Sequence, residues 1–266
     1  MSSTQLSLTS RQHAPEPIYV LGVRVDRVSQ EQALEMIMEM IARRQASENT
    51  LPCQQLITVN PEFVMAAQNN PDFRRTINEA ALVVADGVGV VWASRYLKAP
   101  VPERITGVDT LVALARRCAA AGYRIYLLGA APGVAEETAK RLQSLAPGLQ
   151  IAGTYAGSPA PAEEAEIIER VRAARTDVLC VAYGAPAQDL WIARNLARLP
   201  AALAVGVGGA FDFISGRQRR APRLMQRLGL EWLYRLYREP WRWRRMLALP
   251  RFAVRVVLKG HANHGN

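Results

Sequence analysis

One aspartate in the sequence stands where a catalytic carboxylate is expected. Asp86 follows the apolar run 81–85 and precedes Gly87 and Gly89, so it would lie at a strand end beside adaptable backbone. A carboxylate in that place can act as a general base. An aspartate that caps its own turn would show the same pattern, and position alone does not separate the two interpretations.

Other polar side chains follow strand-like runs or stand beside glycine. Thr58 and Asn60 could hold a polyol by hydrogen bonds, although Asn60 before Pro61 also fits a helix N-cap with proline at the first helical position. Arg104 could neutralise a phosphate through its bidentate guanidinium, or could pair with a surface acid.

Two glycine-containing segments lead from an expected strand into an expected helix. The first, 129–133, contains Gly129 and Gly133, and the second, 184–189, begins with Gly184. Backbone N–H groups at such helix starts suit a phosphate or diphosphate. Each signal is weak alone, because a glycine after a strand is more often turn chemistry. The sequence has no G-x-G-x-x-G and no Walker A motif, which disfavours a Rossmann dehydrogenase and a P-loop NTPase.

The elements that must position these residues alternate along the chain. Strand-like runs cover residues 18–21, 56–59, 82–85, 125–128, 149–155, 178–182 and 203–207, and helix-like stretches cover 29–46, 61–69, 71–80, 107–121, 133–145, 162–174 and 187–198. Ser29 with Gln32 resembles a capping box. This alternation predicts βαβ units: an α/β, Rossmann-like, mostly parallel sheet with helices on both faces. Ligands of such sheets bind beyond the carboxyl ends of the strands, so we expect the candidate residues to share one edge.

Composition excludes several classes of protein. The 266 residues are 50% hydrophobic and 21% charged, which is typical of one globular domain, with or without an appendage, and not of disordered or collagen-like chains. No run of about 18 apolar residues predicts a membrane span, and the N-terminus lacks the features of a secretory signal. The histidines are His13, His261 and His264, and the cysteines are Cys53, Cys118 and Cys180. Histidines confined to the ends argue against a histidine-based triad or zinc site, and the cysteine spacing predicts buried, reduced thiols in a cytoplasmic protein.

The net charge of +10 is concentrated near the C-terminus. Residues 217–259 hold thirteen basic and two acidic side chains, whereas the rest of the chain holds twenty basic and twenty-one acidic ones. This asymmetry divides the chain into functional parts. We expect a disordered lead-in over 1–17, an α/β catalytic core over 18–216, a basic, aromatic appendage over 217–260 and a disordered tail over 261–266.

The appendage interleaves arginine with tryptophan and tyrosine. Residues 223–238 predict one helix with a charged stripe, formed by Arg223, Arg227, Glu231, Arg235 and Arg238. Arginine with Trp and Tyr suits an anionic membrane surface, which is the favoured interpretation. A helix docked on the core with a solvated arginine face, or a nucleic-acid-binding segment, would use the same residues.

Seven ordered motifs resemble one protein family. They are T-V-N-P-E (58–62), A-D-G-V-G (85–89), R-I-T-G-V-D (104–109), L-L-G-A-A-P-G-V-A-E (127–136), G-A-P-A-Q-D (184–189), G-V-G-G-A-F-D-F-I-S-G (206–216) and R-A-P-x-x-x-Q-x-L-G-L-E-W-L-Y-R-L (220–236). Together they resemble the WecG/TagA/CpsF glycosyltransferases over residues 18–245.

The resemblance implies an inverting transfer of a sugar from a UDP-sugar donor to a polyprenyl-diphosphate-linked saccharide. It implies a Rossmann-like core, no metal and no cofactor, and a C-terminal appendage that associates with the inner face of the bacterial cytoplasmic membrane. N-acetylmannosamine, its uronic acid and glucose are all donor sugars within the family, so the sugar and the acceptor stay open. A homo-oligomer is compatible with the basic, aromatic tail, and no nucleic-acid partner is implied.

The resemblance also implies roles for individual residues. The family's general base falls on Asp86, its site threonine, asparagine, arginine and glutamine on Thr58, Asn60, Arg104 and Gln188, and its appendage arginines on Arg235, Arg242 and Arg245. Ala187 and Asp189 replace a lysine and a glutamate that are common in the family. The donor diphosphate is expected near 129–133 and Gly184.

The residues themselves agree with that chemistry. A core without histidine leaves a carboxylate to deprotonate an acceptor hydroxyl. Glycine-loop N–H groups and arginines can stabilise a leaving diphosphate, and no Asp-x-Asp offers ligands for a bridging metal. Three alternatives use the same features: a non-catalytic, membrane-associated nucleotide-sugar-binding module, a nucleic-acid-binding protein, and a nicotinamide-dependent oxidoreductase, which the missing fingerprint disfavours.

Overall fold

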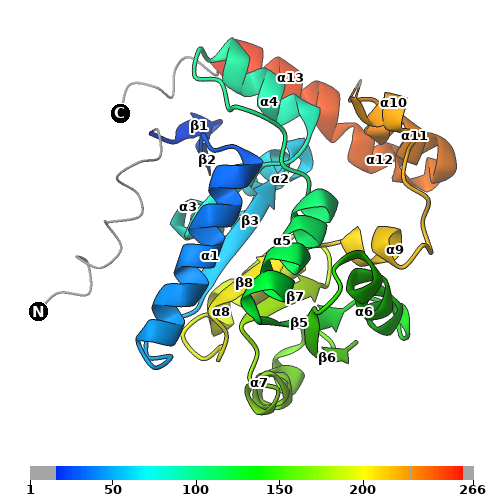
Figure 1. The fold of residues 1–266 in the computed structure, drawn as a ribbon. Helices are drawn as coiled ribbons and strands as arrows, with labels where there is room; N and C mark the ends of the chain where they lie inside the picture. Colours follow the sequence, from blue (N-terminus) through cyan, green and yellow to red (C-terminus); the bar gives the residue numbers. More distant parts are fainter. Residues whose placement is uncertain (1–15, 228, 260–266) are drawn as a thin grey trace, which may run out of the picture.

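The computed structural model describes residues 16–227 and 229–259, shown in Figure 1. Residues 1–15 and 260–266 lie outside the described part, and with them most of the predicted lead-in, the predicted tail, His13, His261 and His264.

A six-stranded parallel sheet forms the centre of the molecule. Its strands are β3 Gln54–Val59, β4 Leu82–Ala85, β5 Arg124–Gly129, β6 Gln150–Tyr155, β7 Val178–Ala182 and β8 Leu203–Gly206, in the order β4-β3-β8-β7-β5-β6. The pairings between these neighbours are all parallel. The predicted α/β class is therefore confirmed, and the apolar character of the inner strands follows from burial on both faces.

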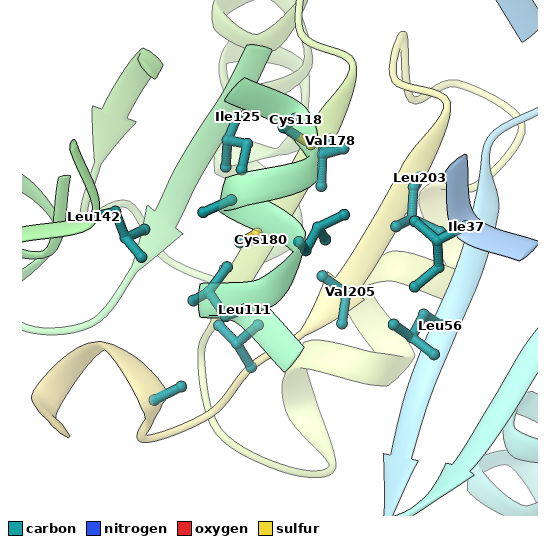
Figure 2. Close-up of a cluster of buried hydrophobic side chains, with 14 of the residues drawn as sticks. Ile37, Leu56, Leu111, Cys118, Ile125, Leu142, Val178, Cys180, Leu203 and Val205 are labelled. Atoms are coloured by element: carbon teal, nitrogen blue, oxygen red, sulfur yellow. The ribbon is translucent and has the colours of Figure 1, made fainter. Parts of the chain in front are cut away.

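One face of the sheet is covered by α1 Gln30–Ala46, α5 Gly107–Ala121, α6 Val134–Leu145 and α9 Ala210–Ile214. Figure 2 shows their contact: Leu111 and Cys118 of α5 lie over Val178, Cys180 and other inward-facing strand residues. All three cysteines are buried free thiols, as predicted. The predicted capping box starts α1, where Ser29 Oγ accepts from Gln32 N at 3.2 Å and Gln32 Oε1 accepts from Ser29 N at 2.9 Å.

The opposite face buries two apolar clusters. α2 Pro61–Ala67, α3 Pro71–Glu79 and α4 Val88–Tyr96 pack over β3 and β4, and α7 Glu164–Ala173 and α8 Ala187–Asn195 pack over β5, β7 and β8. Consecutive strand residues alternate between the faces, so that Leu179 and Val181 belong here while Cys180 points to the α5 side. Helices thus cover both faces, as predicted.

The first strand-like run lies outside this sheet. β1 Ile18–Val20 pairs with β2 Val23–Val25 as an antiparallel ribbon packed on the α2–α4 cluster. Leu21 and Gly22 join the strands with φ of 50° and 78°, the two positive values that a type I′ hairpin needs. β2 was not predicted from the sequence, because Arg24 interrupts its apolar residues.

The appendage consists of short helices, not of the continuous 223–238 helix that the sequence predicted. α10 Arg223–Arg227 and α11 Glu231–Arg238 are separate, and the 3₁₀ turn Pro240–Arg242, α12 Trp243–Met246 and α13 Ala248–Lys259 follow. Gly229 ends the first helix in a left-handed conformation with φ of 72°. The side chains of Arg223 and Arg227 lie outside the described part, so the predicted stripe is described only from Glu231 onward.

Two side chains fasten the appendage to the core. Phe252 and Val256, one turn apart on α13, are buried among the α2–α4 side chains. Figure 1 shows α13 lying beside α4, with α10–α12 continuing over the same end of the molecule. Within the described ranges no helix is long and apolar enough to cross a bilayer.

Candidate active site

A cavity of about 140 Å³ lies where the appendage meets the carboxyl ends of β3 and β4. Its lining residues are Asn60, Pro61, Glu62, Asp86, Gly87, Val88, Gly89, Arg104, Gly229, Glu231, Trp232, Arg235, Met246 and Leu249. The structure thus brings together four of the residues singled out from the sequence, namely Asn60, Asp86, Arg104 and Arg235. We call this space the Asp86 pocket.

Asp86 faces the pocket and does not cap its own turn. Gly87 is the N-cap of α4 and no side chain caps that helix, while Asp86 Oδ2 accepts a hydrogen bond from Gly107 N at 3.5 Å. Desolvation by the surrounding protein raises the pKa of Asp86 to about 6, against the opposing effects of Arg235, the Gly107 N–H and Arg104. A carboxyl with this pKa is ionised at neutral pH and still basic enough to take a proton.

The charged partners of Asp86 come from the core and from the appendage. α11 carries Glu231 and Arg235 one turn apart, so both face the same pocket. Arg104 Nη1 lies 3.7 Å from Glu231 Oε2, and the guanidinium of Arg235 lies 4.5 Å from the centroid of the Phe213 ring. Of the two predictions for Arg104, a phosphate contact or an ion pair with a surface acid, the structure shows an ion pair. Its partner Glu231 lines the pocket and is not a surface acid.

An ion-pair network behind the pocket fixes α11. Arg220 Nη1 and Nη2 donate to Asp109 Oδ1 and Oδ2 at 2.6 and 2.8 Å, and Arg220 Nε lies 3.6 Å from Glu231 Oε1. Thr106, the N-cap of α5, donates from its hydroxyl to Asp109 Oδ2 at 2.6 Å. Asp109 and Arg220 had no role predicted from the sequence, and Glu231 was predicted only as part of the charged stripe, although all three stand in the family motifs.

Thr58 and Asn60 occupy structural positions beside the pocket. Asn60 Oδ1 accepts from Phe63 N at 3.0 Å and caps α2, with Pro61 at the first helical position, so the helix-cap alternative is confirmed. The hydroxyl of Thr58 lies in the direction of Gly107, and this residue is buried. Asn60 also lines the pocket, where its side-chain N–H groups can still donate.

Gln188 holds two strand ends together. It is only 2% exposed, and its Oε1 accepts from Gly184 N at 3.1 Å and from Gly208 N at 3.0 Å. The side chain thus ties the loop after β7 to the loop after β8. Gly129 has a comparable structural role, because a Cβ there would lie 2.8 Å from the Ala182 backbone.

The strand order separates the glycine loops from Asp86. β4, which ends at Ala85 directly before Asp86, lies four steps from β5, which ends at Gly129. At about 4.8 Å a step, these strand ends are about 19 Å apart. The boundary between β5 and β7 is instead flanked by Gly129, Gly133 and Gly184. The connection after β5 leads toward one edge of the sheet and the connection after β7 toward the other, and ligands of such folds bind at this switch point.

The appendage arginines differ in their surroundings. Arg245 Nη2 lies 2.7 Å from Glu62 Oε2, and Arg245 lines an adjoining hollow of about 360 Å³ with Arg244 and Arg251. Glu62 borders both this hollow and the Asp86 pocket. The side chain of Arg242 lies outside the described part of the chain. No three His, Cys, Asp or Glu side chains of the described ranges form a group that could hold a metal ion.

Asp189 is a buried carboxyl beside the loop after β8. It is 1% exposed, and neither carboxyl oxygen has a hydrogen-bond partner among the described residues. Gly206 leaves the space for it, because a Cβ there would lie 2.6 Å from Asp189 Oδ1. Desolvation raises the pKa of Asp189 to about 7.

Comparisons with known proteins match the chain over most of its length. The sequence profile of the glycosyl transferase WecG/TagA/CpsF family matches residues 18–265. A Bacillus spizizenii protein named N-acetylglucosaminyldiphosphoundecaprenol N-acetyl-beta-D-mannosaminyltransferase is 36% identical over 76% of this chain and 78% of its own length. A Staphylococcus aureus (strain MW2) protein of the same name is 30% identical over 90% of this chain and 91% of its own.

The pocket charges should set the protonation of Asp86. We expect the carboxyl of Asp86, followed by ¹³C NMR, to titrate with a midpoint of about 6. Arg235→Gln should raise the midpoint because a nearby cation is lost, and Glu231→Gln should lower it because a nearby anion is lost. Arg251→Gln, in the adjoining hollow, is the matched control. Shifts of the same sign in both pocket variants would contradict this electrostatic account.

Burial of Asp189 should make the folded state less stable as pH rises. Its pKa is raised on folding, so between about pH 4 and about pH 7 the unfolded chain releases a proton that the folded protein keeps. The stability from this group is full below pH 4 and is lost at about 1.4 kcal/mol per pH unit up to pH 7. Asp189→Asn should therefore gain stability relative to the wild type between pH 4.5 and pH 8, measured by urea unfolding. A difference between the two proteins that is independent of pH would refute the raised pKa.

Proposed function

The chain belongs to the glycosyl transferase WecG/TagA/CpsF family, and from this premise we propose that it transfers a hexosyl group from a UDP-sugar to a polyprenyl-diphosphate-linked saccharide. The observation that carries the proposal is the Asp86 pocket, where a carboxyl with a raised pKa lies beside Arg104 and Arg235. The product would serve the synthesis of a bacterial cell-surface polysaccharide.

The relatives narrow the substrates that we propose. Their names state an N-acetyl-beta-D-mannosaminyl transfer to N-acetylglucosaminyl-diphosphoundecaprenol. We therefore propose N-acetylmannosamine as the donor sugar, ahead of its uronic acid and glucose, and the undecaprenyl-linked N-acetylglucosamine as the acceptor.

In the proposed reaction Asp86 is the general base. Its carboxylate takes the proton of an acceptor hydroxyl, the hydroxyl oxygen forms a bond to the anomeric carbon, and the bond from that carbon to the donor diphosphate breaks. Attack opposite the leaving group inverts the anomeric centre. UDP leaves with the electron pair of the broken bond.

Arginines and backbone N–H groups would stabilise the leaving diphosphate. Arg104 and Arg235 line the Asp86 pocket, and Arg104 contacts Glu231 only loosely, so an incoming diphosphate can replace that acid. The Asp86 pocket is too small for a whole donor, and the glycine loops lie several strands away. We therefore propose that the nucleoside end of UDP-sugar extends along the strand ends toward Gly184 and Gly129, with the diphosphate closer to Asp86.

The appendage would hold the enzyme at the inner face of the membrane. On α13 the buried residues Phe252 and Val256 leave Val254 and Leu258 on the outer side, with Arg251 and Arg255 beside them. Tyr237 and Trp241 add exposed aromatic surface, at 81% and 72% exposure. Apolar and aromatic side chains flanked by arginines favour the interface of an anionic bilayer.

Loss of the proposed base should abolish most of the turnover. Asp86→Asn should keep the fold and reduce UDP release by at least about 100-fold, the lower end of the effect of a general base. Asp72→Asn, an exposed carboxylate paired with Arg75 on α3, is the matched control and should leave turnover unchanged. Near-normal turnover of Asp86→Asn would reject the assignment.

A panel of donors tests the substrates in the same assay. UDP release from UDP-N-acetylmannosamine, dependent on a short lipid-diphosphate N-acetylglucosamine acceptor and undiminished by EDTA, is expected. Release from another UDP-sugar would correct the donor, and a requirement for added metal would overturn the metal-independent mechanism. No release with any donor, in protein that binds lipid and is folded, would favour a nucleotide-sugar-binding module.

Membrane binding should depend on the exposed appendage residues. The double variant Tyr237→Ala, Trp241→Ala should bind phosphatidylglycerol vesicles at least about tenfold more weakly in flotation. Each aromatic side chain that enters the bilayer interface contributes more than about 1 kcal/mol to the binding free energy. Tyr19→Ala, an exposed aromatic on β1, is the control. If the double variant floats like the wild type but has lost a dimer that the wild type forms in light scattering, this surface serves self-association instead. Binding to DNA without lipid would point to a nucleic-acid partner.

A further inference from the structure

A cavity larger than the Asp86 pocket lies at the amino-terminal ends of the strands, on the opposite side of the molecule from that pocket. It has a volume of about 780 Å³, within the range of small-molecule sites, which is about 300–1,000 Å³. Residues at the amino-terminal ends of the strands border it: Leu51 and Pro52 precede β3, Arg124 begins β5, Asp177 precedes β7 and Pro200 precedes β8. In Figure 1 these strand ends are opposite the appendage helices.

The walls of this cavity carry an excess of positive charge. Five arginines line it, namely Arg44, Arg124, Arg172, Arg175 and Arg198, against the two acids Glu169 and Asp177. Both acids are already paired, Glu169 with Arg172 at 3.1 Å and Asp177 with Arg124 at 3.7 Å. Of the remaining arginines, Arg198 lies 3.7 Å from Glu164 outside the cavity, whereas Arg44 and Arg175 have no carboxylate of the described residues within ion-pair distance.

Arg44 is the exceptional residue of the group. It is 8% exposed, yet no carboxylate oxygen of the described residues lies within ion-pair distance of its guanidinium. Its Nη1 donates to the Leu51 carbonyl, but its buried Nε has no hydrogen-bond partner. The hydroxyl of Thr176, also in the wall, is a second buried group without a partner. A buried cation without a counter-charge and with an unpartnered donor is costly unless an anion compensates it.

We propose that this cavity binds a soluble, phosphate-bearing small molecule, with its phosphate on Arg44 and Arg175 and its body against Leu51, Ile168 and Leu199. Phosphate oxygens accept several hydrogen bonds in the planar geometry that guanidinium groups offer. Ile168 and Leu199 supply an apolar wall for the rest of the ligand. The site is separate from sugar transfer, which we place at the carboxyl ends of the strands.

The position of Arg44 at a helix end does not by itself explain the site. Arg44 lies in the last turn of α1, where a cation interacts favourably with the helix dipole. Arg43 lies in the same turn but has a partner in Glu39 and does not line the cavity. The helix dipole therefore accounts for a cation in this turn, but it does not account for a cation that is buried without a carboxylate partner and with its Nε unbonded.

Titration with inorganic pyrophosphate, followed by amide NMR of the full chain, tests the proposal. Shifts of the Thr50 and Thr176 amides report this cavity, and shifts of Gly87 and Gly107 report the Asp86 pocket. We expect saturable shifts at Thr50 and Thr176 with pyrophosphate but not with chloride at equal ionic strength. Because binding is read without turnover, the outcome is independent of the proposed transferase activity.

Three variants sharpen the test. Arg44→Met, which keeps the length of the side chain, and Arg175→Gln at the exposed rim should each raise the dissociation constant at least about tenfold, the loss of a charge-assisted hydrogen bond. Arg43→Gln is the matched control and should leave it unchanged. The proposal would be overturned if the pyrophosphate-induced shifts were confined to Gly87 and Gly107 or did not saturate at Thr50 and Thr176. It would also be overturned if Arg175→Gln bound pyrophosphate as tightly as the wild type.

Discussion

The arrangement of the candidate active site depends on the ion-pair network that joins Glu231 to the core. Arg220 is held by both oxygens of Asp109 at 2.6 and 2.8 Å, and Glu231 lies between Arg220 and Arg104. Glu231 and Arg235 are one turn apart on α11, so the ion pairs that hold Glu231 in place also orient Arg235 toward Asp86. A partly buried network of this kind is costly to break, since each lost partner leaves an uncompensated charge.

The same contact couples the appendage to the chemistry of Asp86. The covering appendage contributes to the desolvation that raises the pKa of Asp86, and it also supplies Arg235, which opposes that rise. An appendage that moved away would take Arg235 and the wall formed by α11 from the pocket and so change the surroundings of Asp86. Docking of the appendage and protonation of Asp86 are therefore linked.

The core was predictable from sequence because its elements obey local rules. Apolar runs predicted the six sheet strands, and Ser29 and Asn60 marked helix starts by their capping chemistry, whereas the Thr106 cap of α5 was found only in the structure. The appendage helix was predicted wrongly because its periodicity continues through Gly229, which ends α10 in a left-handed conformation and leaves no room for a side chain beside Val88. The pairing of Asp109 with Arg220, 111 residues apart, is carried by no periodic pattern. The site was recognisable by its motifs, while its ion pairs required the fold.

Asp86 follows the edge strand β4, so the proposed active site is bordered by loops and by the appendage and not by strands on both sides. A site in the central crevice of a parallel sheet has strand ends and loops on both sides. β4 has a strand neighbour only in β3, and its outer side is covered by Asp26 and by Ile105, whose N–H donates to the Ala85 carbonyl at 2.8 Å. Beyond these contacts α11 and Gly229 form a further wall of the Asp86 pocket, and glycine fits there because a Cβ at position 229 would lie 2.9 Å from Val88. The segment with the positive charge surplus therefore lies where an anionic substrate would enter.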